Sequence, residues 1–231
     1  MNKKKKIQAQ NFYLILAGIF IASLVTSNLI FQKFFAWNPF GWYIFEISVG
    51  ILPYPITFLV TDIISELYGR KKANRIVMVG LFASIFTLAV VMIADLTAAT
   101  NWSPVDDKQF HHVFGVTYIG VGASMAAYLT AQFIDVQLFH FWKRLTRGRH
   151  LWLRNNASTF TSQFIDTLTV LLLLCFFEII EWKYFWVLLA NGFLFKVIVA
   201  FLDTPIIYLI SWRFRKYFDL KGDGAELPED I

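Results

Sequence analysis

Four aspartates and one lysine fall well inside the long apolar stretches of this 231-residue chain, away from the ends of those stretches. They are Asp62, Asp135, Asp166, Asp203 and Lys196. A charge near the centre of a bilayer costs ~2.5–3.5 kcal/mol on insertion scales, so such residues usually face the interior of a helix bundle and have a partner. Carboxylates accept hydrogen bonds from N–H groups, and a lysine in this setting needs an acid beside it. These five residues are therefore the first candidates for a site that binds a polar solute.

The tetrapeptide Gln-Phe-Ile-Asp occurs twice, at residues 132–135 and at residues 163–166. Positions i and i+3 share one face of a helix, so each copy presents an amide beside a carboxyl group. Such a pair complements the N–H and carbonyl groups on the edge of a guanine-like ring. The aromatic residues, 18% of the chain, are available to stack on such a ring. The spacing alone indicates a small polar solute, either cationic or heteroaromatic.

Six apolar stretches are long enough to position these residues in a membrane, because a hydrocarbon core of about 30 Å takes about 20 helical residues. They cover roughly residues 12–32, 45–67, 76–99, 114–143, 156–179 and 185–212. Pro53 and Pro55 should break or kink the second stretch, and Pro205 is a candidate kink in the sixth. With 57% hydrophobic and only 16% charged residues, the composition is that of a membrane protein. We predict an all-α integral membrane protein, with one six-helix domain over residues 1–231.

The basic residues fall into clusters at alternate ends of these stretches, within residues 3–6, 70–75, 143–154 and 213–221. The opposite connections hold only Lys33, Lys108 and Lys183. Cytoplasmic loops retain positive charge, so both termini are predicted to be cytoplasmic. The basic residues flank spans instead of forming one patch, which favours membrane lipid as the partner and argues against nucleic acid.

The positions along each stretch also predict how deep the charged residues lie. Counted from the inner ends at ~1.5 Å per residue, the four aspartates lie roughly 8–15 Å below the cytoplasmic interface. We therefore expect one shared layer of acids around a polar cavity. Lys196 lies about 10 Å further out than Asp203 on the same helix, so its partner should come from another helix, either Asp166 or Asp135. The alternative is a set of hydrogen bonds that only hold the helices together.

Several other chemistries lack their sequence signatures. The chain has no P-loop, no G-x-S-x-G and no H-E-x-x-H motif, so we predict a protein that is not an enzyme and that needs no cofactor or metal. His111 and His112 share a polar loop that is better explained as a solvated hairpin than as a metal site. Cys175 is the only cysteine, so no intrachain disulfide forms. The small residues from Gly120 to Ala127 permit close packing, within one subunit or across a homodimer.

Three segments resemble signatures of the queuosine precursor transporter family, also called the vitamin uptake transporter family. They are Pro55 to Gly69, which contains Asp62 and Glu66; Ala123 to Asp135, which contains Gln132; and Ala157 to Thr167, which contains Ser158, Thr159, Gln163 and Asp166. Asn28 and Phe195–Lys196 also resemble family positions.

This resemblance implies a multi-pass importer in the cytoplasmic (inner) membrane of a bacterium. Its cargo would be 7-cyano-7-deazaguanine or 7-aminomethyl-7-deazaguanine, salvaged for queuosine in transfer RNA, and the older family name implies vitamins as an alternative. By motif match the substrate-site candidates are Asn28, Asp62, Glu66, Gln132, Asp135, Ser158, Thr159, Gln163, Asp166 and Lys196. The rival interpretation is a substrate-binding subunit of an energy-coupling vitamin transporter, which would need a separate ATPase.

Within this set the residue types themselves favour the two Gln–Asp pairs. They are Gln132 with Asp135 and Gln163 with Asp166. Glu66 is a weaker candidate, because it is expected near the membrane surface, where Arg70 four residues later is its natural partner.

Overall fold

The computed structural model describes residues 3–39, 41, 43–115, 117–147, 149–220 and 225–228. Within the helices, the side chains at positions 117–121, 123, 124 and 154 are outside this description. The small-residue run from Gly120 to Ala127, which was expected to pack closely against another helix, therefore lies partly outside the described residues.

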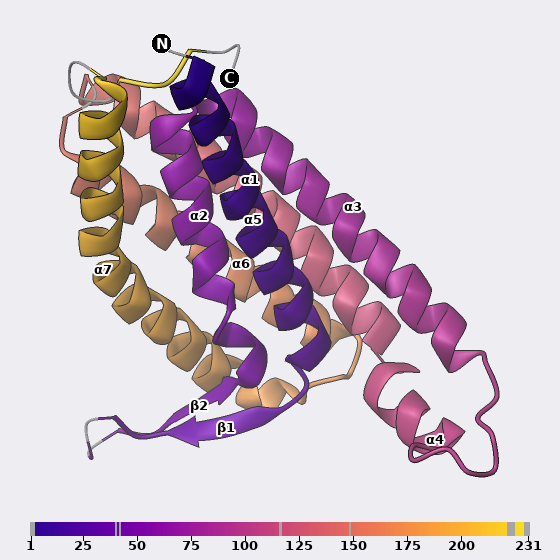
Figure 1. The fold of residues 1–231 in the computed structure, drawn as a ribbon. Coiled ribbons are helices and arrows are strands. Elements are labelled where there is room, and N and C mark those ends of the chain that lie inside the picture. Colours follow the sequence, from indigo (N-terminus) through magenta and orange to yellow (C-terminus); the bar gives the residue numbers. More distant parts are fainter. Residues whose placement is uncertain are drawn as a thin grey trace.

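Long helices make up the body of the protein (Figure 1). They are α1 (Lys3–Ile30), α2 (Tyr54–Leu67), α3 (Arg70–Asp95), α5 (Thr117–Leu145), α6 (Leu151–Phe176) and α7 (Phe185–Phe218). Within the described residues, five helical segments are long and apolar enough to cross a membrane, namely Lys3–Ile30, Val49–Leu67, Arg70–Asp95, Leu151–Phe176 and Trp182–Phe218. The chain is thus a mostly helical, multi-pass membrane protein.

Several helices extend beyond the apolar stretches into the basic clusters. The third begins at Arg70 and not near residue 76, and the sixth long helix continues to Phe218 and not to residue 212. Lysine and arginine are good helix formers, and their aliphatic stems can lie along apolar surface while the charges reach water. The end of an apolar stretch is therefore not the end of the helix. α7 also runs through Pro205 as one helix, curving along its length in Figure 1.

The second predicted stretch is wrong in its outer third. Residues 45–67 were expected to form a helical span that breaks or kinks at Pro53 and Pro55, but β2 (Phe45–Ser48) pairs antiparallel with β1 (Phe34–Trp37), in the register Phe34 opposite Ser48. A 3₁₀ turn, η1 (Val49–Ile51), follows, and α2 begins only after Pro53. The paired prolines break the stretch, as expected, because proline fits the first turn of a helix but removes a donor from its interior.

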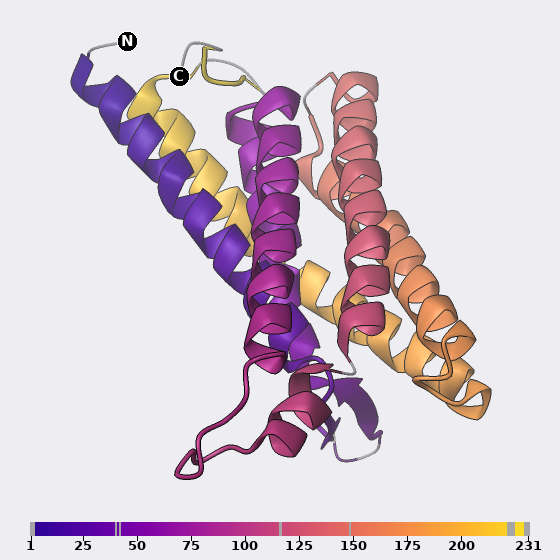
Figure 2. The same cartoon turned by 90° about the vertical axis from the view of Figure 1, so that its right-hand side faces the viewer.

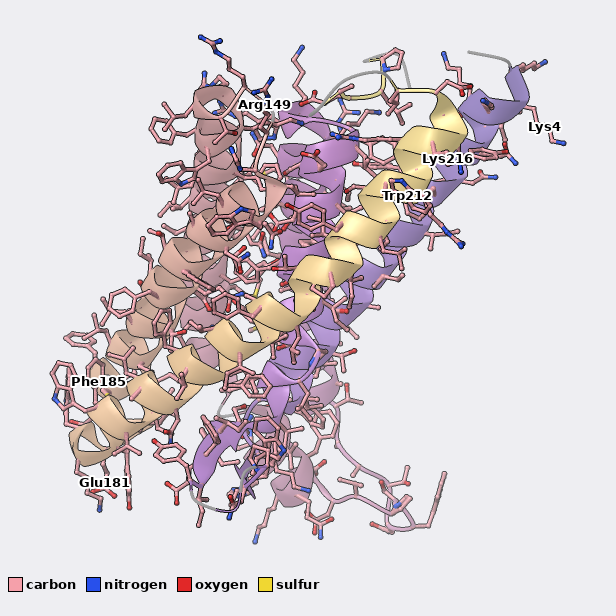
Figure 3. The ribbon with its side chains drawn as sticks, turned by 90° about the vertical axis from the view of Figure 1, so that its left-hand side faces the viewer. Lys4, Arg149, Glu181, Phe185, Trp212 and Lys216 are labelled. Carbon is pink, nitrogen blue, oxygen red and sulfur yellow. The ribbon has the colours of Figure 1, made fainter. Side chains whose placement is uncertain are left out.

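The bundle has two chemically different ends. Figure 3 shows Lys4, Arg149 and Lys216 at one end, here called the basic end, and Glu181 at the other. The β-hairpin lies at this second end, called the hairpin end (Figure 1). The α3–α5 connection also projects there, and it contains the short helix α4 (Asp107–Phe110) and the turn η2 (His111–Gly115) in place of the simple hairpin that was expected.

Helix α2 is the centre of the bundle. Every residue of α2 except Ile56 and Leu59 is buried, whereas α3 exposes large apolar side chains such as Phe82 and Phe86. Figure 2 shows α1 and the basic-end half of α7 running side by side, with the rings of Phe12 and Phe214 5.4 Å apart. The exposed apolar surface of the outer helices suits contact with lipid, and α2 is shielded from it.

Candidate functional site

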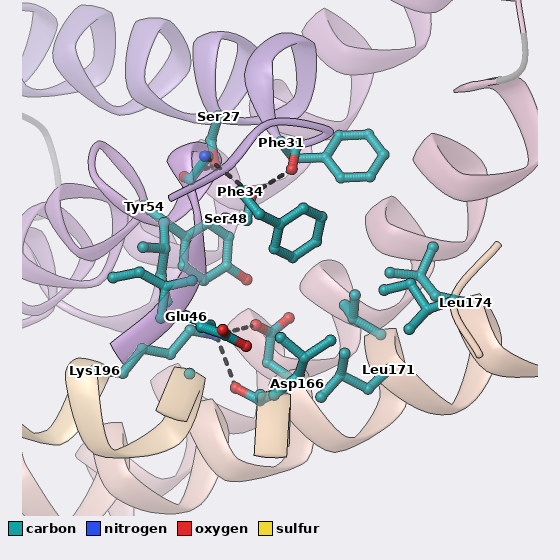
Figure 4. A pocket seen from close by; sticks show the side chains of 18 of the residues that line it. Ser27, Phe31, Phe34, Glu46, Ser48, Tyr54, Asp166, Leu171, Leu174 and Lys196 are labelled. Atoms are coloured by element: carbon teal, nitrogen blue, oxygen red, sulfur yellow. Dashed lines mark hydrogen bonds and ion pairs between the residues drawn. The ribbon is translucent and has the colours of Figure 1, made fainter. Parts of the chain in front are cut away.

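A cavity of about 140 Å³ opens at the hairpin end of the bundle. Residues of α1, the β-hairpin, η1, the start of α2, α6 and α7 meet around it (Figure 4). Aromatic rings of Phe31, Phe34 and Tyr54 form part of its wall, and the apolar residues Leu171 and Leu174 of α6 form another part. The hollow is therefore largely apolar, with a few polar groups that converge on it.

The main polar feature of the cavity is an ion pair between two helices. Lys196 Nζ on α7 donates to Asp166 Oδ2 on α6 at 2.7 Å and to Thr167 Oγ1 at 2.9 Å. The same nitrogen lies 4.6 Å from the centre of the Tyr54 ring on α2. The expectation that Lys196 takes its partner from another helix is confirmed, and that partner is Asp166.

Two buried polar atoms at this cavity have no hydrogen-bond partner among the described residues. They are Oδ1 of Asp166 and Nδ2 of Asn28 on α1. The first is an acceptor and the second a donor. Leaving such buried groups unsatisfied costs ~1–3 kcal/mol each, so a ligand that supplies both a donor and an acceptor would be stabilised here.

A second acidic pair lies deeper, between α2, α5 and α6. Asp62 Oδ2 accepts from Thr159 Oγ1 at 3.2 Å, and Asp135 Oδ1 accepts from Ser162 Oγ at 2.8 Å. The carboxyl groups of Asp62 and Asp135 lie within hydrogen-bonding reach of each other, and Ser158 also faces Asp135. None of these side chains lines the cavity at the hairpin end.

The predicted single layer of four aspartates is wrong for Asp166. Asp135 contacts α6 at Ser162, whereas Asp166 lies one helical turn, about 6 Å, further toward the hairpin end. Asp203 of α7 stays near Asp62. The depth count failed because helices extend beyond their apolar stretches by different lengths, so their inner ends do not share one level.

The two Gln–Asp motifs turn out to have different surroundings. Gln132 lies fully buried between α5 and α2, where its Oε1 accepts from Thr61 Oγ1 at 3.3 Å and its Nε2 donates to Thr57 Oγ1 at 3.4 Å. Gln163 is also buried, and its Oε1 has no partner among the described residues. Neither amide lines the cavity. The structure therefore brings Asn28, Asp166 and Lys196 together there, and it leaves the other candidates in the deeper layers.

Glu66 belongs to a separate ionic cluster at the basic end. Its fully buried carboxylate pairs with Arg215 of α7 and with Lys143 of α5, the latter at 3.5 Å. Lys143 Nζ also donates to Glu226 Oε1 at 2.9 Å. The expectation of a surface carboxylate with only a local partner is wrong, because α2 is enclosed by its neighbours along its whole length.

Several residues of the cavity were not predicted from the sequence. Glu46 of β2 and Phe34 of β1 line it from the hairpin, and Tyr54 lines it from the start of α2. The alternation of apolar and polar residues in Phe45-Glu46-Ile47-Ser48, just before two prolines, was a signal for a half-buried strand. It was overlooked because these residues also continue an apolar stretch.

Comparisons with known proteins point to a transporter family. The family model described as "Putative vitamin uptake transporter" matches residues 48–210. A protein of Bacillus subtilis (strain 168) named "Probable queuosine precursor transporter" is 28% identical over 164 residues, 70% of each chain. A protein of Haemophilus influenzae (strain Rd) with the same name is 27% identical over 123 residues, 53% of this chain and 49% of its own length. No solved structure matches the chain.

The matched region extends from the second strand of the hairpin to the middle of the last helix. It includes both partners of the Asp166–Lys196 pair and both members of the deeper pair, Asp62 and Asp135. The chain belongs to the queuosine precursor transporter family, also called the vitamin uptake transporter family.

Proposed function

We propose that this protein imports a 7-deazaguanine, the 7-cyano or the 7-aminomethyl form, across the cytoplasmic membrane of a bacterium. The names of the two relatives support a queuosine precursor as the cargo. The observation that carries the proposal is the buried Asp166–Lys196 pair in a cavity with aromatic walls, because it offers a charged acceptor and a charged donor to one planar ring.

The sides of the membrane follow from the charge distribution. The basic end holds the lysine and arginine clusters, and positively charged segments stay in the cytoplasm. The hairpin end and its cavity then face outward, and both described helical termini lie inside. Helix α5 serves as a sixth span in this proposal, since its 29 residues exceed the about 20 that a bilayer requires.

The polar groups of the cavity complement a guanine-like edge. Asp166 Oδ1, which is free of other partners among the described residues, would accept hydrogen bonds from the ring N1–H and the exocyclic amino group. Lys196 Nζ has three N–H bonds, two of which are used within the protein, and the third would donate to the ring carbonyl oxygen. Tyr54 and Phe34 provide aromatic surfaces on which the ring can stack.

The basic end is closed in the same conformation. Glu66, Lys143 and Arg215 join α2, α5 and α7 there, and Leu227 of the C-terminal segment packs into the core, its backbone N–H donating to Leu67 O at 2.8 Å. An open cavity on one side and an ionic closure on the other correspond to the outward-facing state of a carrier. Release to the cytoplasm would require the ionic cluster to separate.

The test uses cells that cannot synthesise the precursor and that express this chain as their sole importer. Queuosine in transfer RNA, measured after adding 7-cyano-7-deazaguanine or the 7-aminomethyl form, should depend on the chain. Asp166→Asn should lower it by at least about tenfold, because losing a charged hydrogen bond costs ~1.5–3 kcal/mol. The matched control is Asp107→Asn, a change of the same type in the exposed α3–α5 connection.

Two other outcomes would count against this proposal. If cells with Asp166→Asn make as much queuosine as cells with the wild type, at equal protein levels in the membrane, then Asp166 is not part of the binding site. Uptake into liposomes that contain only this protein would separate a self-sufficient carrier from the alternative, a binding subunit of an energy-coupling vitamin transporter. Uptake only after an ATPase module is added would favour that alternative.

A further inference from the structure

A continuous polar stripe crosses the bundle interior along one face of α6. It consists of Asn155, Ser158, Thr159, Ser162, Gln163, Asp166 and Thr167, all of them buried. The spacing of three and four residues keeps them on one face, and the stripe is about 18 Å long. From helix α2, Asp62 accepts from Thr159 of this stripe, and Thr57 and Thr61 contact Gln132 of α5 beside it. Hydroxyl, amide and carboxyl groups therefore extend from the cavity inward to the Asp62–Asp135 pair.

The Asp62–Asp135 pair differs from the other buried acids in its charge balance. Asp166 has Lys196, and Glu66 has Arg215 and Lys143. Among the described residues, neither Asp62 nor Asp135 forms an ion pair with a basic side chain.

In each carboxyl group of this pair, one oxygen accepts a hydrogen bond and the other oxygen has no donor among the described residues. Thr159 and Ser162 each satisfy one oxygen, and the remaining oxygens, Asp62 Oδ1 and Asp135 Oδ2, have no donor among the described residues. Both side chains are at most 2% exposed. The two carboxyl groups lie within hydrogen-bonding reach of each other and away from water, so they cannot both be ionised. A single proton between them supplies the missing donor.

The surrounding charges favour the same arrangement. Asp203 approaches the pair from α7 and adds negative charge. Asp166 with Lys196 lies one turn outward along α6, and Glu66 with Arg215 lies one turn inward along α2. On α1 and α3 the charged residues lie only near the helix ends. A metal ion is less suited to this place, because the hydroxyl groups of Thr159 and Ser162 already donate to the carboxylates and because an ion would need several oxygen ligands around it.

We propose that the Asp62–Asp135 pair carries one exchangeable proton that crosses the membrane with each substrate molecule. The protein is then a proton-coupled symporter with separate sites, the Asp166–Lys196 cavity for the substrate and the deeper acidic pair for the proton. The polar stripe on α6 links the two sites, and the proton enters from the hairpin end and leaves at the basic end. This inference rests on the proposed import function, but the proton on the acidic pair can be detected without transport.

The transport test uses liposomes containing purified protein, with the membrane potential held at zero by valinomycin and equal potassium on both sides. The probe is 7-cyano-7-deazaguanine, which is uncharged. One proton per substrate predicts about tenfold accumulation for an outside that is one pH unit more acidic, since one pH unit corresponds to 1.36 kcal/mol. Asp62→Asn and Asp135→Asn should lose this accumulation yet keep counterflow exchange, and Asp219→Asn, an exposed control, should behave as wild type.

The second readout is infrared spectroscopy of the substrate-free protein at neutral pH. A protonated carboxyl band that shifts in deuterium oxide should be present in wild type and in Asp166→Asn, and it should disappear in Asp62→Asn and Asp135→Asn. If wild type fails to transport any deazaguanine but shows this band, the cargo is wrong and the protonated pair stands.

Three results would overturn the proton proposal. One is the absence of the band in a protein that transports. Another is accumulation driven by a sodium gradient and not by a proton gradient. The third is loss of counterflow in Asp135→Asn together with loss of substrate binding, which would make Asp135 part of the substrate site.

Discussion

At the scale of single residues, the chemistry of this protein depends on how each buried charge is balanced. Lys196 lies in an apolar helix, and only its contacts with Asp166, Thr167 and the Tyr54 ring make this position tolerable. Removing one partner of a buried ion pair costs ~3–5 kcal/mol, because the other charge is left without compensation. The pair therefore contributes to the stability of the bundle as well as to the proposed recognition of the ring.

Lys196→Ala is expected to lower precursor uptake by at least about tenfold, because it removes the donor to the ring carbonyl and leaves Asp166 uncompensated. Lys183→Ala serves as the control, since Lys183 is 59% exposed and contacts its sequence neighbours Glu181 and Tyr184. Uptake and protein level in the membrane are measured for both variants. Equal uptake by the two would show that burial gives Lys196 no special role.

At the scale of elements, the hairpin and the 3₁₀ turn set the position of the outer wall of the cavity. Gly50 in η1 lies directly against the end of α1, where an added Cβ would come within 2.7 Å of Ser27 O and 2.8 Å of Phe31 Cα. Ser27 Oγ donates to Gly50 O across this contact. Backbone atoms cannot move aside as a flexible side chain can, so only glycine allows the turn to approach α1 this closely.

Gly50→Ala is therefore expected to destabilise the protein by about 1–3 kcal/mol, the usual cost of overpacking, and to weaken binding of the deazaguanine. Gly18→Ala is the matched control, because no atom lies within 4 Å of a Cβ at Gly18 on the exposed side of α1. Thermal unfolding in detergent, with and without ligand, measures both effects. An unfolding temperature for Gly50→Ala as high as that for Gly18→Ala would contradict the close packing.

At the scale of the whole molecule, one end of the bundle is open and the other is held together by ion pairs. The hairpin end contains the open cavity, while at the basic end Glu66, Arg215, Lys143 and Glu226 join three helices and the C-terminal segment. These residues are separated by long stretches of sequence, so the cluster can break only if α2, α5 and α7 move relative to one another. It is the part of the structure best suited to act as a gate at the basic end.

Glu66→Gln should open this gate more often, because the neutral amide loses the charge attraction to Arg215 and Lys143. The reporter is Ser65→Cys in a Cys175→Ala background, which has no other cysteine. Ser65 is fully buried, so labelling by a membrane-impermeant maleimide in inside-out vesicles should be slow and should become severalfold faster with Glu66→Gln. Thr97→Cys at the hairpin end is the control, and unchanged labelling of Ser65→Cys would argue against a gate here.

The sequence by itself determined the features that depend on local composition. The apolar stretches located the long helices, the paired prolines broke the second stretch, and the basic clusters identified one end of the bundle. The aspartates and Lys196 were also recognisable as interior residues, because the cost of a charge in lipid does not depend on the details of the fold.

Only the tertiary structure decided which of these residues meet. Glu66 and Arg215 are 149 positions apart, and nothing in either segment indicates the other. Helical periodicity fixes the face on which a residue lies relative to its own helix axis, but the rotation and the depth of each helix are set by its packing against the others. For that reason the sequence predicted the four aspartates as one layer, whereas the packed bundle places Asp166 in the cavity with Lys196 and leaves Asp62 and Asp135 as a deeper acidic pair.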